Sequence, residues 1–195
     1  MKFTFVTLFS NLIEPYFHDS ILKRAIESNF ISYEFYNPRD FTTNKHKKVD
    51  EQMVGGGAGM LLTCQPLFDC LDEIKSKNAD AYIVFPLAAA KPFRQNDAKR
   101  LAKKKNIVFV SGRYEGIDER VIEKYANEVF SIGEFILTGG ELPSLVMADA
   151  ISRNVEKVLG IADSLDVEGN KNNLLEAQSF TKPEIFQKLG VLKDF

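Results

Sequence analysis

The sequence predicts an α/β fold built around a parallel sheet, and three observations support this prediction. Apolar, β-branched segments alternate with helical patterns of roughly ten residues. The segment 107–110 reads Ile-Val-Phe-Val, so both faces of this strand should be covered by helices. Hydrophobic residues make up 45% of the 195 residues, which is enough for a real core in one domain of ordinary size.

The chain begins with two expected strands and one expected helix. Residues 2–8 are aromatic and β-branched, and residues 31–36 alternate between apolar and polar side chains, so both segments are expected to be strands. Between them, residues 19–28 place their apolar side chains on one face of a helix. The polar, basic stretch 39–54 is expected to be a loop, either simply solvated or in contact with phosphates.

A glycine-rich segment, Gly55-Gly56-Gly57-Ala58-Gly59-Met60, follows this loop. Its glycines leave the backbone amides open and cost folding entropy, so the segment either holds an anion or lets a ligand touch the backbone. It is not a P-loop, because no Gly-Lys-Ser/Thr follows. It is not the dinucleotide fingerprint either, because Met60 stands where the third glycine belongs.

Helices and strands continue to alternate through residue 110. Residues 66–75 have one apolar helical face, and residues 81–86 are expected to form a buried strand. Asn96 is expected to cap a basic helix that runs through Lys105. The lysines of this helix either form a solvated face or contact RNA. The apolar strand 107–110 comes next.

The segment 111–120 follows the carboxyl end of that strand, where open parallel sheets bind ligands. Gly112 and Gly116 flank an Arg-Tyr-Glu sequence, and a turn alone does not require three such functional side chains. Asp118 is expected to cap the next helix. The segment is therefore a candidate binding loop.

The segment 131–143 (Ser-Ile-Gly-Glu-Phe-Ile-Leu-Thr-Gly-Gly-Glu-Leu-Pro) is apolar in the middle and has glycines on both sides. One interpretation is a buried strand that runs into a helix, with Thr138 as the cap and Glu141 three residues later. The other is backbone wrapped around a flat ligand such as a purine, because glycine permits close approach. Both interpretations remain open at this point.

A helix is expected at 141–159, with Asp149 and Arg153 as neighbours one turn apart. Beyond residue 160 the composition becomes acidic, then rich in asparagine, which is typical of a flexible linker. Residues 180–186 suggest the approach to another structured piece.

Composition and charge exclude several classes. The net charge is −2, so any nucleic acid must be held by local basic patches. Cys64 and Cys70 have no zinc-site spacing, and free thiols fit a reducing cytoplasm. The first nine residues lack a signal-peptide cleavage site, and no apolar run approaches the length of a membrane span. We expect a cytoplasmic protein with no membrane partner.

Three motifs in this order resemble the bacterial tRNA (guanine-N1)-methyltransferases, a TrmD-like family of the knotted (SPOUT) class. They are the glycine-rich segment 55–60, the segment 112–120 and the segment 132–143. The resemblance covers essentially the whole chain. It implies methylation of N1 of guanosine 37, next to the anticodon of tRNA, by a homodimer that binds no DNA. The cofactor is S-adenosylmethionine, held in a deep trefoil knot, and Mg²⁺ is a suggested helper.

The resemblance also implies which residues hold the cofactor. One set is Phe85, Pro86, Leu87, Ala88, Gly112, Tyr114, Glu115, Gly116, Ile132, Gly133, Glu134, Phe135, Ile136, Leu137, Gly139 and Gly140. The sequence departs from the family at 87–90, where Leu-Ala-Ala-Ala replaces the usual Ser-Pro-Gln-Gly and makes this wall more apolar. Glu176 matches an acidic residue that approaches the cofactor of the other subunit.

Two catalytic residues follow from the resemblance. The family's general base is an Asp in a Ser-x-x-x-Asp-Ser-Phe pattern, and here Ser164 leads to Glu168 followed by Gly-Asn. Glu168 is therefore the expected base, with Asp166 as the alternative. Arg153 matches an arginine that stabilises the negative charge developing on guanine O6. No metal-ligand pattern is present in the sequence.

The expected organisation is a knotted α/β methyltransferase domain at 1–160, a linker at 161–179 and, at 180–195, the start of a small helical tRNA-binding domain that is expected to be mostly absent. Two alternatives of function stay open: another knotted RNA methyltransferase, and a non-catalytic dimeric RNA-binding module. A dehydrogenase-like nucleotide binder is a poor alternative, because Phe9-Ser10-Asn11 and not a glycine fingerprint follows the first strand.

Overall fold

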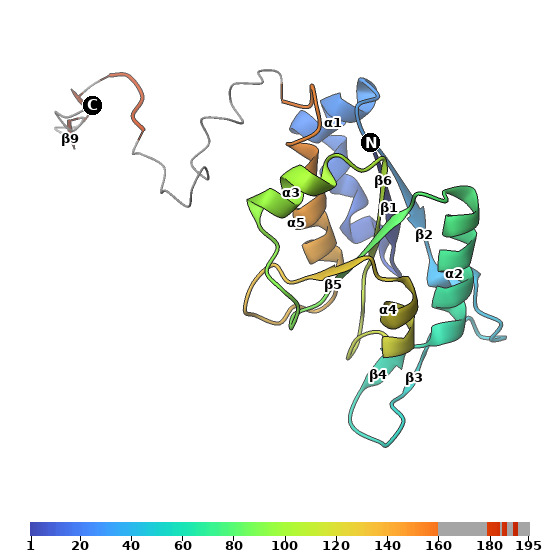
Figure 1. Ribbon diagram of the computed structural model, residues 1–195. Helices are drawn as coiled ribbons and strands as arrows, with labels where there is room; N and C mark the ends of the chain where they lie inside the picture. Colours follow the sequence, from blue (N-terminus) through green and yellow to red (C-terminus); the bar gives the residue numbers. More distant parts are fainter. Residues whose placement is uncertain (160–178, 184, 187–188, 191–195) are drawn as a thin grey trace. The chain divides into compact units, whose positions relative to one another are not determined.

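Five parallel strands form the central sheet of this computed structural model, which describes residues 1–159, 179–183, 185–186 and 189–190. The strand order is β2-β1-β6-β5-β7, and every neighbouring pair is parallel. The strands are β1 (Lys2–Val6), β2 (Ser32–Tyr36), β5 (Tyr82–Pro86), β6 (Asn106–Val110) and β7 (Glu128–Phe130). The predicted parallel-sheet α/β fold is therefore confirmed (Figure 1).

Helices cover both faces of the sheet (Figure 1). On one face lie α1 (Ser20–Glu27), α3 (Gln95–Leu101) and α5 (Glu141–Ser152). On the other lie α2 (Cys64–Lys77) and α4 (Glu119–Tyr125). Three short 3₁₀ helices complete this part of the chain: η1 (Ser10–Leu12), η2 (Glu14–His18) and η3 (Pro38–Asp40).

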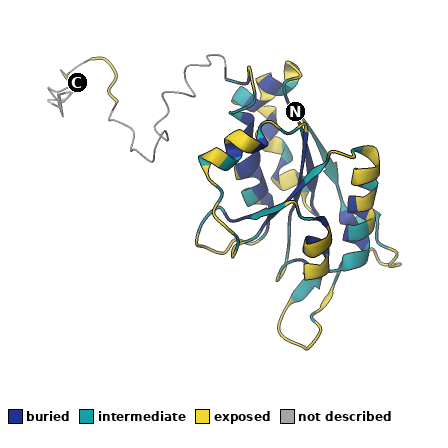
Figure 2. Cartoon of the chain, viewed as in Figure 1, coloured by how far each residue is buried: buried dark blue, intermediate teal, exposed yellow. Residues whose placement is uncertain are grey.

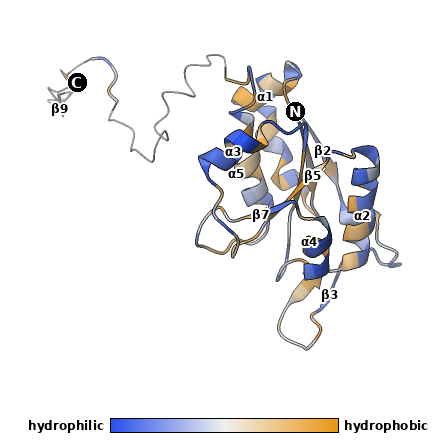
Figure 3. Ribbon diagram, viewed as in Figure 1, coloured by the Kyte–Doolittle hydropathy of each residue, from blue (hydrophilic) through white to orange (hydrophobic). Residues whose placement is uncertain are grey.

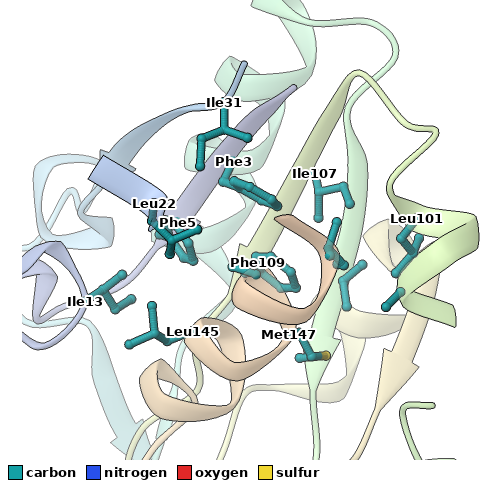
Figure 4. Close-up of a cluster of buried hydrophobic side chains, with 14 of the residues drawn as sticks. Phe3, Phe5, Ile13, Leu22, Ile31, Leu101, Ile107, Phe109, Leu145 and Met147 are labelled. Atoms are coloured by element: carbon teal, nitrogen blue, oxygen red, sulfur yellow. The ribbon is translucent and has the colours of Figure 1, made fainter. Parts of the chain in front are cut away.

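The strands serve two cores because successive side chains point to opposite faces. Phe3, Phe5 and Phe109 pack under α1 and α5, and Figure 4 shows these rings beside Leu145 and Met147 of α5. On the opposite face, residues such as Val108 and Val110 pack against α2 and α4. The fully apolar segment 107–110 is buried at every position, as the sequence predicted. Figure 2 shows the buried residues concentrated in the strands and in α5.

A β-hairpin occupies part of the region expected to be a loop. β3 (Asp50–Gln52) pairs antiparallel with β4 (Met60–Leu62), and the glycine-rich segment is the turn between them. Gly55, Gly56, Gly57 and Gly59 all have positive φ angles, between 84° and 127°. Only glycine adopts such angles without strain, so these residues allow the hairpin to reverse. The loop prediction missed β3 because its sequence, Asp-Glu-Gln, has no strand propensity.

The helices α3 and α5 end earlier than expected. α3 ends at Leu101, and its N-cap is Arg94, whose amide donates to the Asp97 side chain; Asn96 is inside the helix. Figure 3 shows α3 as a hydrophilic helix. α5 ends at Ser152, seven residues before the predicted end. The Ser152 hydroxyl donates to the carbonyl of Ala148, and the side-chain amide of Asn154 donates to the carbonyl of Ala150. These side chains compete with backbone amides for the carbonyls that a continued helix would use.

Contacts divide the chain into two units, Met1–Gly160 and Ile161–Phe195. In the second unit, β8 (Ile185–Phe186) pairs antiparallel with β9 (Leu189–Gly190). The described residues of this unit thus form a short β pairing in a region where a helical domain was expected to start. The division into a linker and a further domain stays a prediction.

Candidate functional site

A cavity of about 300 Å³ lies where the carboxyl ends of β5, β6 and β7 meet. Three segments line it: 86–88 after β5, 112–117 after β6, and 130–143 after β7. This edge is where open parallel sheets bind ligands, because the chain leaves neighbouring strands in loops that can diverge around a ligand. The volume falls at the lower end of the range for small-molecule sites.

Backbone hydrogen bonds fix the loop after β5 against the segment after β7. The amide of Leu87 donates to the carbonyl of Phe130 at 2.8 Å, and the amide of Ser131 donates to the carbonyl of Lys91 at 2.9 Å. The amide of Phe93 donates back to the carbonyl of Ser131 at 2.8 Å. These bonds extend the parallel pairing past the strand ends and set the width of one side of the cavity.

The loop after β6 is a tight turn braced by the hairpin. Tyr114 has a φ of 60° and Gly116 a φ of 129°, and the amide of Gly116 donates to the carbonyl of Arg113 at 3.0 Å. Two bonds of 3.0 Å attach this turn to β4: the Glu115 amide donates to the carbonyl of Met60, and the Leu62 amide donates to the carbonyl of Gly116. The hairpin therefore acts as a support for the binding loop.

The segment 131–140 is an open loop. β7 ends at Phe130, and the apolar side chains that follow are exposed, with Phe135 at 54% and Ile136 at 84%. The interpretation of this segment as a buried strand was therefore wrong, and α5 has Gly140, not Thr138, as its N-cap. An apolar pair in solvent beside an apolar-walled cavity is available to a ligand or to another protein surface.

Gly140 lies directly against the chain that follows β6. Its amide donates to the carbonyl of Gly112 at 2.8 Å. A Cβ atom built on Gly140 would lie 2.8 Å from the Cα of Ser111 and 2.8 Å from the nitrogen of Gly112. The missing side chain of Gly140 thus makes room for backbone of the same molecule. At Gly133 the space is taken by the ring of Phe135.

Most of the residues that the sequence assigned to the cofactor lie on this cavity. They are Pro86, Leu87, Ala88, Gly112, Tyr114, Glu115, Gly116, Ile132, Gly133, Phe135, Ile136, Leu137, Gly139 and Gly140. Phe85 is fully buried in the core and does not line the cavity, because the pleat turns it away from Pro86. Glu134 is exposed and is not in the wall. Glu168, Asp166 and Glu176 lie outside the described residues.

The cavity also includes residues that sequence reasoning did not assign: Arg113, Ile117, Phe130, Ser131 and Pro143. Arg113 and Ile117 belong to the quoted motif 112–120, so their position in that motif was an available signal. Ser131 and Pro143 are the first and last residues of the segment 131–143 that the sequence singled out, whereas no pattern distinguishes Phe130 from an ordinary strand residue.

Arg153 and Asp149 lie near the end of α5 and not in the cavity wall. Burial raises the pKa of Asp149 above its ordinary value, while the positive charge of Arg153 acts in the opposite direction. The two groups therefore interact, as their one-turn spacing predicted. Within the described ranges, no three His, Cys, Asp or Glu side chains are grouped to hold a metal ion.

The walls of the cavity suit an adenine nucleoside. Pro86, Leu87, Ile132 and Leu137 supply apolar surface, and the glycine-flanked segments 112–116 and 132–140 supply main chain. A base would pack on the apolar groups while amides and carbonyls meet its polar edge. Small-molecule sites combine buried apolar surface with a few polar groups that fix the orientation of the ligand.

Within the described part of the chain, no helix is long and apolar enough to cross a membrane.

Comparison with known proteins identifies the family of this chain. The family model described as tRNA (Guanine-1)-methyltransferase TrmD matches residues 1–194. A tRNA (guanine-N(1)-)-methyltransferase from Sulfurimonas denitrificans is 63% identical over 195 residues, which are 100% of this chain and 84% of that protein. The enzyme of the same description from a Sulfurovum species is 64% identical over 195 residues, covering 100% of this chain and 86% of that protein.

A solved structure is also similar. The crystal structure of a tRNA (m1G37) methyltransferase from Aquifex aeolicus superimposes with a TM-score of 0.82 at 28% sequence identity. The match covers 98% of this chain and 80% of that one. With a family model that spans nearly every residue and relatives that are more than 60% identical, the chain belongs to the TrmD family of tRNA (guanine-1)-methyltransferases.

Proposed function

We propose that this chain methylates N1 of the guanosine at position 37 of tRNA, with S-adenosylmethionine as the methyl donor. Membership of the TrmD family supports the reaction, and the solved relative of Aquifex aeolicus is described as acting at this position. The observation that carries the proposal is the cavity at the carboxyl ends of β5, β6 and β7, where two of the three lining loops belong to the recognised motifs 112–120 and 132–143. The family match favours this function over another RNA methyltransferase or a non-catalytic RNA-binding module.

Different residues of the cavity would contact different parts of the methyl donor. Leu87, Ile132 and Leu137 would hold its adenine ring between apolar side chains, and the main chain of 132–137 and of Gly112 would meet the polar edges. When bound, S-adenosylmethionine supplies an electrophilic methyl group on a positively charged sulfur. Three segments of the chain line the cavity around the place where such a group would lie.

The harder part of the reaction concerns guanine N1, which carries a proton. We propose that Glu168 accepts this proton, as a general base, with Asp166 as the alternative. Loss of the proton places negative charge on O6, which Arg153 stabilises. Asp149 supports this role of Arg153, because the two groups interact near the end of α5. The Watson–Crick edge is accessible only after the base leaves its stack.

Further features of the family are part of the proposal. The bond between Gly140 and Gly112 is consistent with a chain that passes through a knot at this point. The exposed apolar residues Leu142 and Val146 on α5 are consistent with a homodimer, in which Glu176 would approach the partner's cofactor. The basic loop 39–54, Lys99 of α3 and the lysines 103–105 that follow this helix are candidates for phosphate contacts with tRNA in the cytoplasm.

The resemblance to the family also suggests Mg²⁺ as a helper ion. No group of acidic side chains in the described residues fits such an ion, and no step of the proposed reaction is assigned to it. The expectation of a Mg²⁺ requirement stays a prediction.

The proposal is tested by methyl transfer to tRNA. The protein is incubated with labelled S-adenosylmethionine and a transcript that carries guanosine at position 37, and the product is digested to nucleosides. We expect 1-methylguanosine from this transcript and none from a transcript with adenosine at position 37. A different methylated nucleoside would favour another RNA methyltransferase, and no product would favour a binding module.

A further inference from the structure

A buried ion pair joins the loops after β6 and β7. The Nε of Arg113, in the cavity wall, lies 2.9 Å from the Oε2 of Glu141, the first residue of α5. Glu141 is only 2% exposed. The two atoms are close, but the N–H does not point along the hydrogen-bond direction, so the contact is chiefly one of charge. Arg113 is thus a cation beside the cavity whose charge is balanced by one carboxylate.

The carboxylate is held in place from the other side by Thr7, the residue that follows β1. The hydroxyl of Thr7 donates to the Oε1 of Glu141 at 2.8 Å, and both residues are buried. The Thr7 hydroxyl in turn accepts from the amide of Phe9 at 2.9 Å. The carboxylate of Glu141 is therefore held by a second contact, at the end of β1, that does not involve Arg113.

Arg113 is also confined. Its guanidinium lies 4.5 Å from the centre of the Phe9 ring, and its Nη1 donates to the carbonyl of Thr138 at 3.2 Å. A Cβ atom on Gly139 would lie 2.6 Å from the Nε of Arg113 and 2.7 Å from the Oε2 of Glu141. Gly139 therefore leaves the space that the ion pair occupies. Three segments of the chain converge on one guanidinium.

We propose that Glu141 is a positioning residue that fixes Arg113 and balances its charge, so that the cavity admits a cationic sulfonium. This inference rests on the proposed function. The cavity is only about 300 Å³, so a ligand that fills it lies within reach of the Arg113 charge. In a site partly shielded from water, an unbalanced guanidinium would repel a positively charged sulfur. Glu141 removes that repulsion.

The inference is tested by comparing two ligands that differ in charge at sulfur. S-adenosylmethionine carries a positive sulfur, and S-adenosylhomocysteine, the demethylated product, is neutral there. The dissociation constants of both ligands are measured by calorimetry for the full chain and its variants. A change that only loosens the site weakens both ligands equally, whereas a change in charge alters the ratio of the two constants.

Two single variants have opposite expected signs. Glu141→Gln leaves the Arg113 charge unbalanced, so binding of S-adenosylmethionine should weaken roughly tenfold more than binding of S-adenosylhomocysteine. Arg113→Met leaves the negative charge of Glu141, so the ratio should shift toward S-adenosylmethionine. The double variant Arg113→Met with Glu141→Gln should return the ratio to that of the unchanged protein. If one variant does not fold, the other still decides the question.

A matched control exists at the opposite edge of the sheet. The hydroxyl of Thr4 donates to Glu34 at 2.9 Å, and Lys2 pairs with the same carboxylate at 2.8 Å, so the chemistry is that of Thr7, Glu141 and Arg113. Glu34→Gln should leave the ratio unchanged, because this triad is not in the cavity wall. An unchanged ratio in folded Glu141→Gln or Arg113→Met would overturn the inference while leaving the proposed function intact. Failure of the unchanged protein to bind either ligand would reject both.

Discussion

The amide of Gly140 donates a 2.8 Å hydrogen bond to the carbonyl of Gly112, so the start of α5 is fastened to the loop after β6. Buried side chains reinforce this contact. The Ser144 hydroxyl donates to the carbonyl of Gly140 at 2.7 Å and lies 3.1 Å from the hydroxyl of Ser111. Two of the three loops around the cavity are therefore held by one short stretch of backbone, and the geometry of the cavity depends on it.

Gly140→Ala should destabilise the fold by about 1–3 kcal/mol, because the added methyl group would overlap backbone that cannot rotate away. Urea unfolding measures the loss. Gly133→Ala is the control: its methyl group meets only the ring of Phe135, which is exposed and free to move, so the loss should be smaller. Equal losses in the two variants would show that the contact between Gly140 and Ser111 does not limit packing.

The ionised carboxylate of Glu128 should stabilise the protein above pH 4.5. Burial raises its pKa, but hydrogen bonds from Arg100, Lys91 and Tyr82 outweigh burial and lower the pKa from 4.5 to about 2. Since the folded state holds the proton less tightly than the unfolded state, this stabilisation is complete above pH 4.5 and is lost as the pH falls toward 2. Its upper bound is about 3 kcal/mol.

Glu128→Gln should therefore unfold at lower urea concentration than the unchanged protein at pH 7, and the difference should shrink as the pH falls from 5 toward 2. The measurement is urea unfolding at a series of pH values. A difference that stays constant with pH would mean that the side chain contributes through packing and not through its charge.

Glu168→Gln should leave the affinity for S-adenosylmethionine unchanged and slow methyl transfer by a factor of about 10²–10⁴, because the amide cannot accept the N1 proton. Calorimetry and single-turnover transfer measure the two effects. Asp166→Asn is the matched comparison in the same segment and should retain transfer. The opposite pattern, with loss of transfer only in Asp166→Asn, would identify Asp166 as the base.

The proposed homodimer predicts that the exposed apolar residues of α5 are covered in solution. Leu142 and Val146 lie one turn apart and are 55% and 43% exposed in the single chain. Leu142→Glu combined with Val146→Glu should convert the dimer to a monomer, because two charges would be buried without partners. Val54→Glu at the hairpin tip is the control. Sedimentation of the unchanged protein as a monomer would contradict the dimer.

The sequence predicted the parts of the site that local chemistry determines. The strands 81–86 and 107–110 were recognised because each is a short run of apolar, aromatic and β-branched residues, and Gly112 and Gly116 marked the turn at a strand end. Asp118 was correctly predicted as a helix cap, and its side chain accepts from the amide of Arg120. These features depend on residues close together in the chain.

Other features depend on contacts that the sequence does not encode locally. The strand Asp50–Gln52 forms only because glycines reverse the chain and bring it against Met60–Leu62. Successive side chains of β5 point to opposite faces, so Phe85 enters the core while Pro86 lines the cavity, and which face meets the cavity depends on the place of β5 in the sheet. Glu141 pairs with Arg113 and accepts a hydrogen bond from Thr7. These three residues come from distant segments of the chain, so no spacing in the sequence indicates the contact.

A crystal structure of the protein grown with S-adenosylmethionine tests the central claim most directly, namely that the loops after β5, β6 and β7 hold the methyl donor. We predict density for the adenosine against the main chain of 132–137 and Gly112, with the adenine between Leu87 and Leu137. Adenosine bound elsewhere, or a cavity filled by the side chains of 132–137 with the ligand excluded, would contradict the account.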